Sequence, residues 1–270
     1  MIYVRDKGQM CNNVLQYAHV YAFAREHGRR SVSMRFAYKY QYFNICKTRG
    51  HNFFRYLWAK TACTRGWIPT VSYDTPGEVS AAKEQAILRP GSVVVQGWEV
   101  RFYDLFLKYI DEIRPLFGFL PEVSRAVAPL VAEGEGGVRL GVHVRRGDYA
   151  RWKGGRYLFD DRQYARVAAS FAALHPGTKL TVYVCSNDPN LDPDVYRKAL
   201  PDAKIIFPKG NPGEDLCLLS QCDALIGAPS TFSLVASMYR DLPLYWIEDP
   251  DKPLEECDFG RFERLFKEIK

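Results

Sequence analysis

The sequence predicts an α/β protein of two domains, the C-terminal one built on a doubly wound parallel sheet. Three observations support this prediction. From residue 138 onward, predicted strands and helices alternate regularly, as they do in a parallel sheet covered by helices. The glycine-rich acidic stretch 133–137 is typical of a linker and separates this region from the rest. A chain of 270 residues is long enough to bury two modest cores.

The N-terminal domain is expected over residues 1–132 and begins with a βαβ unit. The apolar run 2–5 predicts a strand, and a loop leads from it into a helix that starts near Asn12, a good N-cap residue. The helix is expected to stop at Gly28, because glycine readily adopts the backbone conformation that ends helices. A strand over 31–36 completes the unit.

The middle of this domain gives a weaker pattern. The aromatic and basic stretch 37–67 fits either a core packed by aromatic side chains or the wall of a sugar-binding site. After it, a strand is expected over 92–96, and helices are expected over 103–117 and 121–132.

The C-terminal domain is expected over residues 138–250. Its strands are predicted at 138–145, 179–185, 204–207, 223–227 and 243–247, and its helices at 161–174, 193–200, 214–222 and 231–240. Residues 251–270 contain a last helix, 259–269, which we expect to pack back onto the N-terminal domain. The two domains are expected to face each other across a cleft.

Composition and charge restrict the class of protein. The chain is 47% hydrophobic and 25% charged without low-complexity tracts, which indicates a globular protein. A net charge of +6 favours anionic partners such as nucleotide phosphates, acidic lipid surfaces or nucleic acid, although a mildly basic surface without a partner explains it equally well.

The cysteines and the apolar runs bear on localisation. Seven scattered cysteines without metal-ligand or disulfide spacing predict reduced thiols in a cytoplasmic protein. We expect neither a signal peptide nor a membrane span, which leaves open a peripheral contact with an anionic membrane.

Polar side chains gather in four loops at predicted strand ends, where open α/β sheets bind their ligands. The most informative loop holds His143, Arg145, Arg146 and Asp148 directly after an apolar run. Paired arginines suit a diphosphate, because the guanidinium donates bidentate hydrogen bonds and stays charged at physiological pH. Asp148 is not needed to hold phosphate and is therefore a candidate for chemistry. The alternative is a surface turn in which Asp148 pairs with an arginine.

Two further loops cover residues 8–13 and 185–189. The first leads into a helix N-terminus, which offers N–H groups to an anion, although Asn12 also fits a simple cap. In the second, Asp188 is able to accept two hydrogen bonds from the edge of guanine. The alternative is that Asn-Asp-Pro is only a turn that ends the strand.

The fourth loop, 227–233, places Ser230 and Thr231 at a helix N-terminus. Their hydroxyl groups either bind phosphate oxygens or cap the helix. A serine nucleophile is disfavoured, because Phe232 stands where a nucleophile elbow needs its second glycine. Together the four loops describe a nucleotide-sugar site. No acidic D-x-D pair lies beside the phosphate groups, which predicts transfer without a divalent metal or any other cofactor.

Four segments resemble the α-1,2-fucosyltransferase (GT11-like) family and, more distantly, the α-1,6- and protein O-fucosyltransferases. Residues 143–149 match the family motif His-x-Arg-Arg-x-Asp-Tyr. Residues 186–188 are similar to its Ser-Asp-Asp, and residues 230–233 to its Ser-Ser-Phe-Ser. Residues 8–18 are similar to its Gly-Gly-Leu-Gly-Asn-Gln-Met-Phe-Gln-Tyr-Ala. The matches follow the family order.

This resemblance implies a GT-B-like fold, in which two Rossmann-like domains face a cleft. It also implies GDP-fucose as the donor and inversion at the anomeric carbon without a metal. Arg145 would then grip the β-phosphate with support from Arg146, and His143 and Asp188 would hold the guanine. Asn12 corresponds to an asparagine near the glycosidic oxygen in the O-fucosyl relatives.

The rest of the implied donor site is Gly8, Asn187, Ser230, Thr231 and Phe232, with the two hydroxyls on the phosphates. The chain departs from the family pattern at two places. Gln9 and Cys11 replace two glycines of the opening loop, which affects how closely its backbone approaches a ligand. Asn187 replaces an aspartate, so that Asp188 is the one carboxylate of the base-reading loop.

An inverting transfer needs a base on the acceptor hydroxyl and stabilisation of the departing diphosphate. We expect Asp148 to be the base and Arg145 to stabilise the leaving group. Because an arginine neighbour weakens a carboxylate as a base, late release of the proton to the leaving phosphate is the alternative.

The expected acceptor is a glycan, in the synthesis of a surface polysaccharide, and nucleic acid is not expected as a partner. Another GDP-sugar such as GDP-mannose is the alternative donor. A more distant alternative is a non-catalytic module that binds a polyanion through basic residues.

Overall fold

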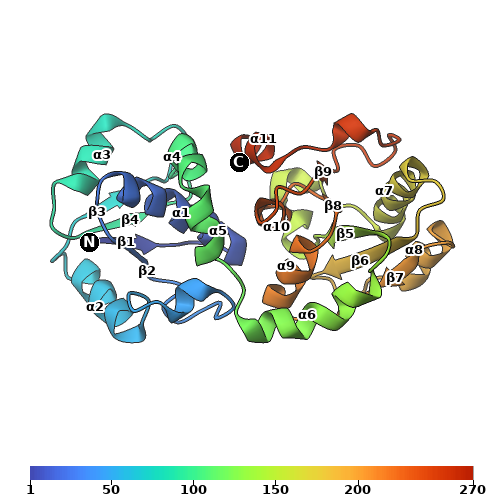
Figure 1. The fold of residues 1–270 in the computed structure, drawn as a ribbon. Helices are drawn as coiled ribbons and strands as arrows, with labels where there is room; N and C mark the ends of the chain where they lie inside the picture. The colour runs from blue at the N-terminus through green and yellow to red at the C-terminus, as the bar shows by residue number, and fades with distance from the viewer. Residues whose placement is uncertain (270) are drawn as a thin grey trace. The chain divides into compact units, whose positions relative to one another are not determined.

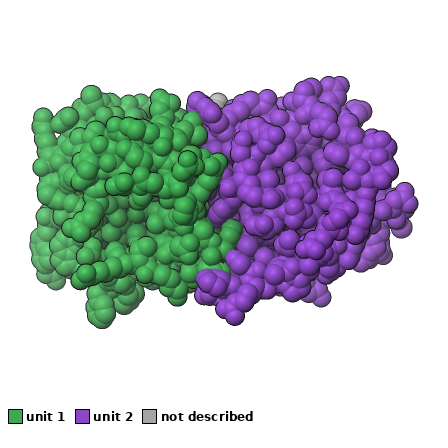
Figure 2. All heavy atoms as spheres, in the orientation of Figure 1, with its two compact units in different colours: residues 1–120 green, residues 121–270 purple. Residues whose placement is uncertain are grey.

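The computed structural model describes residues 1–269 and confirms the α/β class with two parallel sheets. The chain divides into two compact units, unit 1 over Met1–Leu120 and unit 2 from Pro121 onward. Figure 2 colours unit 1 green and unit 2 purple, and Figure 1 labels their elements.

Unit 1 is built on a four-stranded parallel sheet in the order β2-β1-β4-β3. The strands are β1 (Ile2–Arg5), β2 (Ser31–Ser33), β3 (Thr70–Ser72) and β4 (Val93–Gln96). The first three residues of each central strand, β1 and β4, are apolar and buried. The carboxyl ends of β1 and β4 are neighbours at the middle of the sheet, since Arg5 pairs with Gln96.

The helices of unit 1 differ in part from the sequence prediction. They are α1 (Met10–Glu26), α2 (Phe53–Thr64), α3 (Ala81–Leu88), α4 (Tyr103–Lys108) and α5 (Ile110–Leu116), with a 3-10 helix η1 (Asn44–Lys47). The expected Asn12 cap is wrong: the N-cap is Gln9, and Asn12 lies inside the first turn. The expected helix 103–117 is two helices, because Tyr109 leaves the helical conformation.

The aromatic stretch 37–67 combines core and surface. Phe43 is fully buried and contacts Phe117 with ring centroids 5.8 Å apart, as the core interpretation predicts. Phe54, in contrast, is 83% exposed. One interpretation therefore does not hold for the whole stretch.

The domain boundary lies earlier than the predicted linker. Helix α6 (Pro121–Glu133), which we assigned to the N-terminal domain, belongs to unit 2. It packs on helix α9 (Pro212–Ser220), and the Tyr183 hydroxyl donates a 2.7 Å hydrogen bond to the carbonyl of Leu130. The glycine-rich stretch was visible in the sequence and suggested the boundary. The surface of unit 2 on which α6 packs was not visible there.

Unit 2 has a five-stranded parallel sheet in the order β7-β6-β5-β8-β9. The strands are β5 (Val138–Val144), β6 (Leu180–Ser186), β7 (Lys204–Ile206), β8 (Ala224–Gly227) and β9 (Leu244–Trp246). This order confirms the doubly wound sheet. The direction of winding changes between β5 and β8, and ligands of such folds bind outside the carboxyl ends of those strands.

The helices of unit 2 form two groups. Helices α7 (Asp161–Leu174) and α8 (Pro193–Ala199) pack on each other, and α10 (Thr231–Met238) packs on α9 and on α11 (Phe262–Glu268). Three 3-10 helices are η2 (Gly147–Ala150), η3 (Trp152–Gly155) and η4 (Glu256–Asp258). Helix α11 thus has a partner within its own unit, and its expected contact with the N-terminal domain stays a prediction.

No helix within residues 1–269 combines the length and the apolar character that a transmembrane span requires. The seven cysteines all lie in this part of the chain, and none of them forms a disulfide there.

Candidate functional site

Three of the four predicted loops meet where the winding of the unit 2 sheet changes direction. Strand β5 is the central strand and leads into the arginine loop. Strand β6 on one side leads into the Asn187 loop, and strand β8 on the other leads into the Ser230 turn. Parallel strands bring these three carboxyl ends to one edge of the sheet, which is the binding edge of doubly wound folds.

Arg145 is held at its backbone and leaves its guanidinium at the edge of the site. Its N–H donates to the hydroxyl of buried Tyr164 over 3.2 Å. The guanidinium donates to the Asp148 carboxylate over 2.9 Å and lies 5.7 Å from the ring centre of Tyr149. The expected ion-paired turn is therefore present. Because the Asp148 side chain is 61% exposed, water screens this pair and a bound anion competes with it easily.

Arg146 differs from Arg145, whose side chain is nearly as buried at 19% exposure, in that its carboxylate partners are buried as well. It pairs with Asp161 over 2.7 Å and with Asp188 over 2.9 Å, and its Nε donates to the carbonyl of Phe159. The side chain of Arg146 is only 14% exposed. This arginine ties the β5 loop to α7 and to the β6 loop, in agreement with the supporting role that the resemblance implies.

Asn187 joins the β5 and β6 loops through both ends of its amide. Its Oδ1 accepts from the N–H of Arg146 over 3.0 Å, and its Nδ2 donates to the Arg146 carbonyl over 3.2 Å. A carboxylate has no donor and is unable to make the second bond. The replacement of the family aspartate at this position therefore gives the two loops an additional link.

Asp188 uses both carboxylate oxygens inside the loop framework. Oδ2 accepts from Arg146, and Oδ1 accepts from the N–H of Asn190 over 2.9 Å. These hydrogen bonds lower the pKa of Asp188. The carboxylate is ionised as the guanine-reading hypothesis requires, but its position is set by loop contacts.

His143 is a buried neutral imidazole at the end of β5. Its ring stacks on Phe232, with ring centres 4.7 Å apart. Burial, with a smaller effect of the Arg145 charge, lowers the pKa of His143 to about 3. Its Nδ1 is buried and has no hydrogen-bond partner within residues 1–269. Because unsatisfied buried polar atoms are costly, this nitrogen is a candidate ligand-binding atom.

The β8 turn is fixed by Ser230, which caps α10 as predicted. Its hydroxyl accepts from the N–H of Phe232 over 3.1 Å. The hydroxyl of Tyr149 donates to the Pro229 carbonyl and also hydrogen-bonds the Ser230 side chain. Tyr149 thus connects the β5 and β8 loops. Thr231 follows directly and is partly exposed at the start of the helix.

Gly8 and Asn12 come together in unit 1, at the carboxyl end of β1. Gly8 has a φ of +86°, and a Cβ at this position would lie 2.6 Å from Nδ2 of Asn12. Gln16 closes the loop by accepting from the N–H of Lys7 and donating to its carbonyl, over 3.1 Å and 2.7 Å. The first glycine of the family loop is therefore still needed here, although Gln9 and Cys11 replace two others.

Replacing Gly8 with alanine is expected to destabilise unit 1 and to displace the Asn12 side chain. The positive φ alone costs alanine about 1 kcal/mol, and the contact with Asn12 adds to that cost. Gly28→Ala is the matched control, because Gly28 has a φ of +62° and nothing within 4 Å of the added Cβ. Urea unfolding should show a larger fall in the free energy of unfolding for Gly8→Ala than for Gly28→Ala. Equal falls for the two variants would refute the contact between residue 8 and Asn12.

Two buried acids near the strand ends were missed in the sequence. Asp6 follows β1, accepts from the Ser33 hydroxyl, and has its pKa raised to about 8 by burial. Asp215 lies in the first turn of α9, where burial and the Glu214 charge raise its pKa to about 7. Oδ1 of Asp215 has no partner within the described residues. Only the position of each acid after a strand end hinted at a role.

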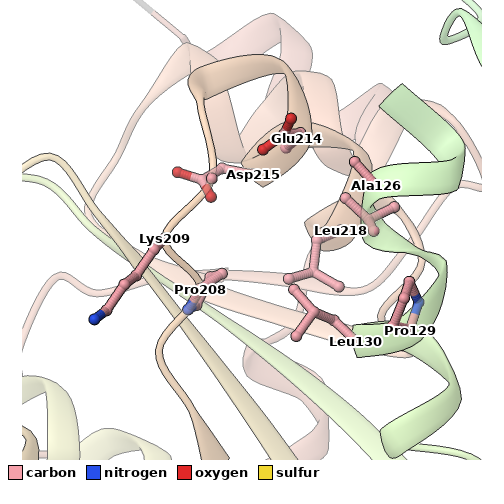
Figure 3. A pocket seen from close by; sticks show the side chains of 10 residues that line it. Ala126, Pro129, Leu130, Pro208, Lys209, Glu214, Asp215 and Leu218 are labelled. Carbon is pink, nitrogen blue, oxygen red and sulfur yellow. The ribbon is translucent and has the colours of Figure 1, made fainter. Parts of the chain in front are cut away.

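Asp215 lines a pocket of about 310 Å³ in unit 2. Figure 3 shows the apolar side chains of Leu130 and Leu218 on one side and the carboxylates of Glu214 and Asp215 on the other. Glu214 is engaged in the cap of α9, since it accepts from the N–H of Asn211. Of these two carboxylates, Asp215 is thus the one that has an oxygen available to accept a hydrogen bond.

Asp215 and His143 belong to the same side of the sheet. Residue partners in neighbouring parallel strands point to the same face, and His143 pairs with Cys185. The Asp215 charge acts on Cys185, and His143 stacks on the first turn of α10, which packs on α9. A neutral imidazole and a carboxyl group, each with an unsatisfied buried atom, therefore lie on the same side of the sheet.

Known structures share this fold. The chain is similar to a mutant of Arabidopsis thaliana FUT1 in complex with GDP, with 12% identity, a TM-score of 0.64, and coverage of 96% of this chain and 73% of that one. POFUT1 in complex with GDP-fucose has 14% identity and a TM-score of 0.61, over 89% and 94% of the two chains. NodZ α-1,6-fucosyltransferase soaked with GDP-fucose has 16% identity and a TM-score of 0.56, over 96% of each.

These similarities show the fold alone, which is the GT-B-like α/β fold expected from the sequence. No family model matches the sequence, and no curated protein sequence matches it. Within residues 1–269, no group of three His, Cys, Asp or Glu side chains is arranged to hold a metal ion.

Proposed function

We propose that this protein is a glycosyltransferase that moves fucose from GDP-fucose to a hydroxyl group of a glycan, with inversion and without a metal ion. One observation carries the proposal. At the binding edge of the unit 2 sheet, Arg145 pairs with an exposed carboxylate and lies over Tyr149, whose hydroxyl bonds the Pro229 carbonyl just before α10. Arg146 instead pairs with two buried carboxylates. The similar folds of structures that hold GDP or GDP-fucose support a nucleotide-sugar donor.

In this proposal the diphosphate takes the place of Asp148 on Arg145. A phosphate carries more charge than a carboxylate and accepts the same bidentate hydrogen bonds from a guanidinium. Ser230 and Thr231 at the N-terminus of α10 add hydroxyl groups and the favourable end of the helix dipole. Donor binding thus releases Asp148 from its ion pair.

The guanine is read by Asp215 and His143. A carboxylate accepts hydrogen bonds from N1–H and the exocyclic amine of guanine, and an imidazole N–H donates to a guanine acceptor. Both side chains have buried atoms without partners, so binding would satisfy groups that are costly in the free protein. Asp188, whose two oxygens already accept hydrogen bonds, is the alternative reader.

The released Asp148 is the general base of the transfer. The acceptor oxygen forms a bond to the anomeric carbon while the bond from that carbon to the β-phosphate oxygen breaks, and the acceptor proton passes to Asp148. Arg145 stabilises the charge that develops on the departing GDP. The alternative is that the proton passes late to the leaving phosphate. Asp148→Asn distinguishes the two mechanisms: a base role for Asp148 predicts a large loss of turnover at unchanged GDP affinity, and late transfer predicts near-normal turnover.

The finer assignments rest on the motif resemblance. Residues 143–149 match the α-1,2 family, which supports an α-1,2 linkage and a role in the synthesis of surface polysaccharide. Asn12, whose side chain lies beside Gly8 in unit 1, is the proposed contact to the glycosidic oxygen.

The affinity for GDP is expected to rise with pH around neutrality. Asp215 has a pKa of about 7 in the free protein, and only its ionised form accepts both guanine hydrogen bonds. Below that pKa, binding must expel a proton, so the affinity should rise about tenfold per pH unit and level off above pH 7. Calorimetric titrations at several pH values should show this rise and its loss in Asp215→Asn. If the pH dependence of GDP affinity is instead lost in Asp188→Asn, Asp188 is the residue that reads the guanine.

A transfer assay tests the proposed reaction. The protein is incubated with EDTA, GDP-fucose and a panel of oligosaccharides, and the release of GDP is measured. Parallel reactions contain GDP-mannose or UDP-galactose as the donor, and the release of nucleotide is compared among the three donors. We expect acceptor-dependent release from GDP-fucose and a product whose anomeric configuration, measured by NMR, is inverted. Release that requires a divalent metal, or a preference for another donor, would contradict the proposal.

A further inference from the structure

Helix α2 of unit 1 exposes its large apolar side chains and buries small ones. Its fully buried residues are two small ones, Ala59 and Ala62. The half-exposed Trp58 ring also lies 5.4 Å from the ring of Tyr3. Four large apolar side chains point outward, and their exposed fractions are 53% for Phe53, 83% for Phe54, 41% for Leu57 and 48% for Trp58. Trp67, shortly after the helix, is 62% exposed. We call this surface, Phe53, Phe54, Leu57, Trp58 and Trp67, the α2 face, after the helix labelled α2 in Figure 1.

The chain around the α2 face carries positive charge only. Residues 27–73 contain six arginines and three lysines and no acidic residue. Within residues 1–269 none of these nine forms an ion pair with a carboxylate. Arg49, Lys60 and Arg65 are exposed on or beside the helix, and the Arg65 guanidinium lies 5.3 Å from the ring centre of Trp67. These three exposed cations therefore carry charge that no ion pair within the described residues neutralises.

We propose that the α2 face docks on a membrane surface with anionic headgroups. Exposed phenylalanine, leucine and tryptophan side chains insert at the boundary of headgroups and acyl chains, while flanking arginine and lysine residues pair with anionic lipid. Leu57 lies among the aromatic residues and has no ring to stack on a base, which favours lipid over single-stranded nucleic acid. The proposal stands on unit 1 and does not depend on the donor site.

Vesicle sedimentation with the whole chain tests this proposal. Vesicles of phosphatidylcholine alone are compared with vesicles that also contain phosphatidylglycerol, at low and at high salt. We expect partitioning at least about tenfold stronger to the anionic vesicles, reduced by salt, with a blue shift of tryptophan fluorescence.

Three variants locate the contact. Phe53→Ser with Phe54→Ser, and separately Lys60→Glu with Arg65→Glu, should each reduce partitioning by about tenfold or more. Because these side chains are exposed, the melting temperature should not change. Leu158→Ser is the matched control, since Leu158 is 42% exposed outside the α2 face and its loss should have no effect.

Several results would overturn the proposal. They are equal binding to neutral and anionic vesicles, no effect of either double variant, or tighter binding of single-stranded RNA through the same residues. Concentration-dependent dimers that the double variants abolish would assign the α2 face to a second copy of the chain instead.

Discussion

Arg145→Ala is expected to remove GDP binding while leaving the fold intact. The guanidinium is the cation proposed for the diphosphate, and its side-chain partner in the free protein is the exposed carboxylate of Asp148. Hydrogen bonds to charged groups contribute about 1.5–3 kcal/mol each, so losing a bidentate contact should weaken GDP at least about a hundredfold. Calorimetric titration with GDP measures the loss, and thermal unfolding should give an unchanged melting temperature.

Two neighbouring variants serve as controls. Arg151→Ala removes an exposed arginine a few residues further on and should bind GDP normally. Arg145→Lys keeps the charge but not the planar fork, and should bind with intermediate affinity. If Arg145→Ala binds GDP as tightly as the unchanged protein, the diphosphate lies elsewhere.

Arg146→Ala is expected to have the opposite effect, a large loss of stability. The guanidinium is 14% exposed, and its partners Asp161 and Asp188 are 13% and 19% exposed. Removing one member of a buried ion pair leaves uncompensated charge and costs about 3–5 kcal/mol. Urea unfolding of unit 2, followed by far-UV circular dichroism, should show a fall in the free energy of unfolding of about 3 kcal/mol.

Arg197→Ala is the matched control for this prediction. Arg197 pairs with Asp194 over 2.8 Å, but both side chains are mostly exposed, so its loss should cost less than about 1 kcal/mol. A stable Arg146→Ala protein that fails to bind GDP would show that both arginines serve the ligand. That result would contradict the division of roles drawn from the burial of their carboxylate partners.

The alternation of unit 2 was predictable because local pattern and fold agree there. The apolar run before Arg145 is the buried β5, and helix 161–174 was predicted with the bounds that the structure shows, since Asp160 and Gln163 form a capping box. The doubly wound sheet follows from these elements and the right-handed rule for crossovers. Unit 1 was less predictable, because β3 and α3 lie in a stretch without a clear periodic pattern.

The arrangement of the site needed the structure. Nothing near Arg146 in the sequence shows that Asp161, fifteen residues later, encloses its guanidinium, because helix packing brings them together. Likewise Asp215 reads as an ordinary acid in the first turn of a helix, and only its burial and unpartnered oxygen mark it. The Asn12 cap failed because Gln9 already ends the extended chain before the helix. The sequence motif thus indicated which loops matter, and packing determined the role of each side chain.

The most direct test of the donor site is calorimetric titration of the unchanged protein with GDP-fucose, GDP-mannose and UDP-galactose, each in the presence of EDTA. The account predicts binding of GDP-fucose that ignores EDTA and exceeds the UDP-sugar affinity by more than about tenfold, or 1.4 kcal/mol. Binding of GDP-mannose with higher affinity would change the sugar but keep the site. No binding of any guanine nucleotide, or equal binding of the UDP-sugar, would contradict the central claim.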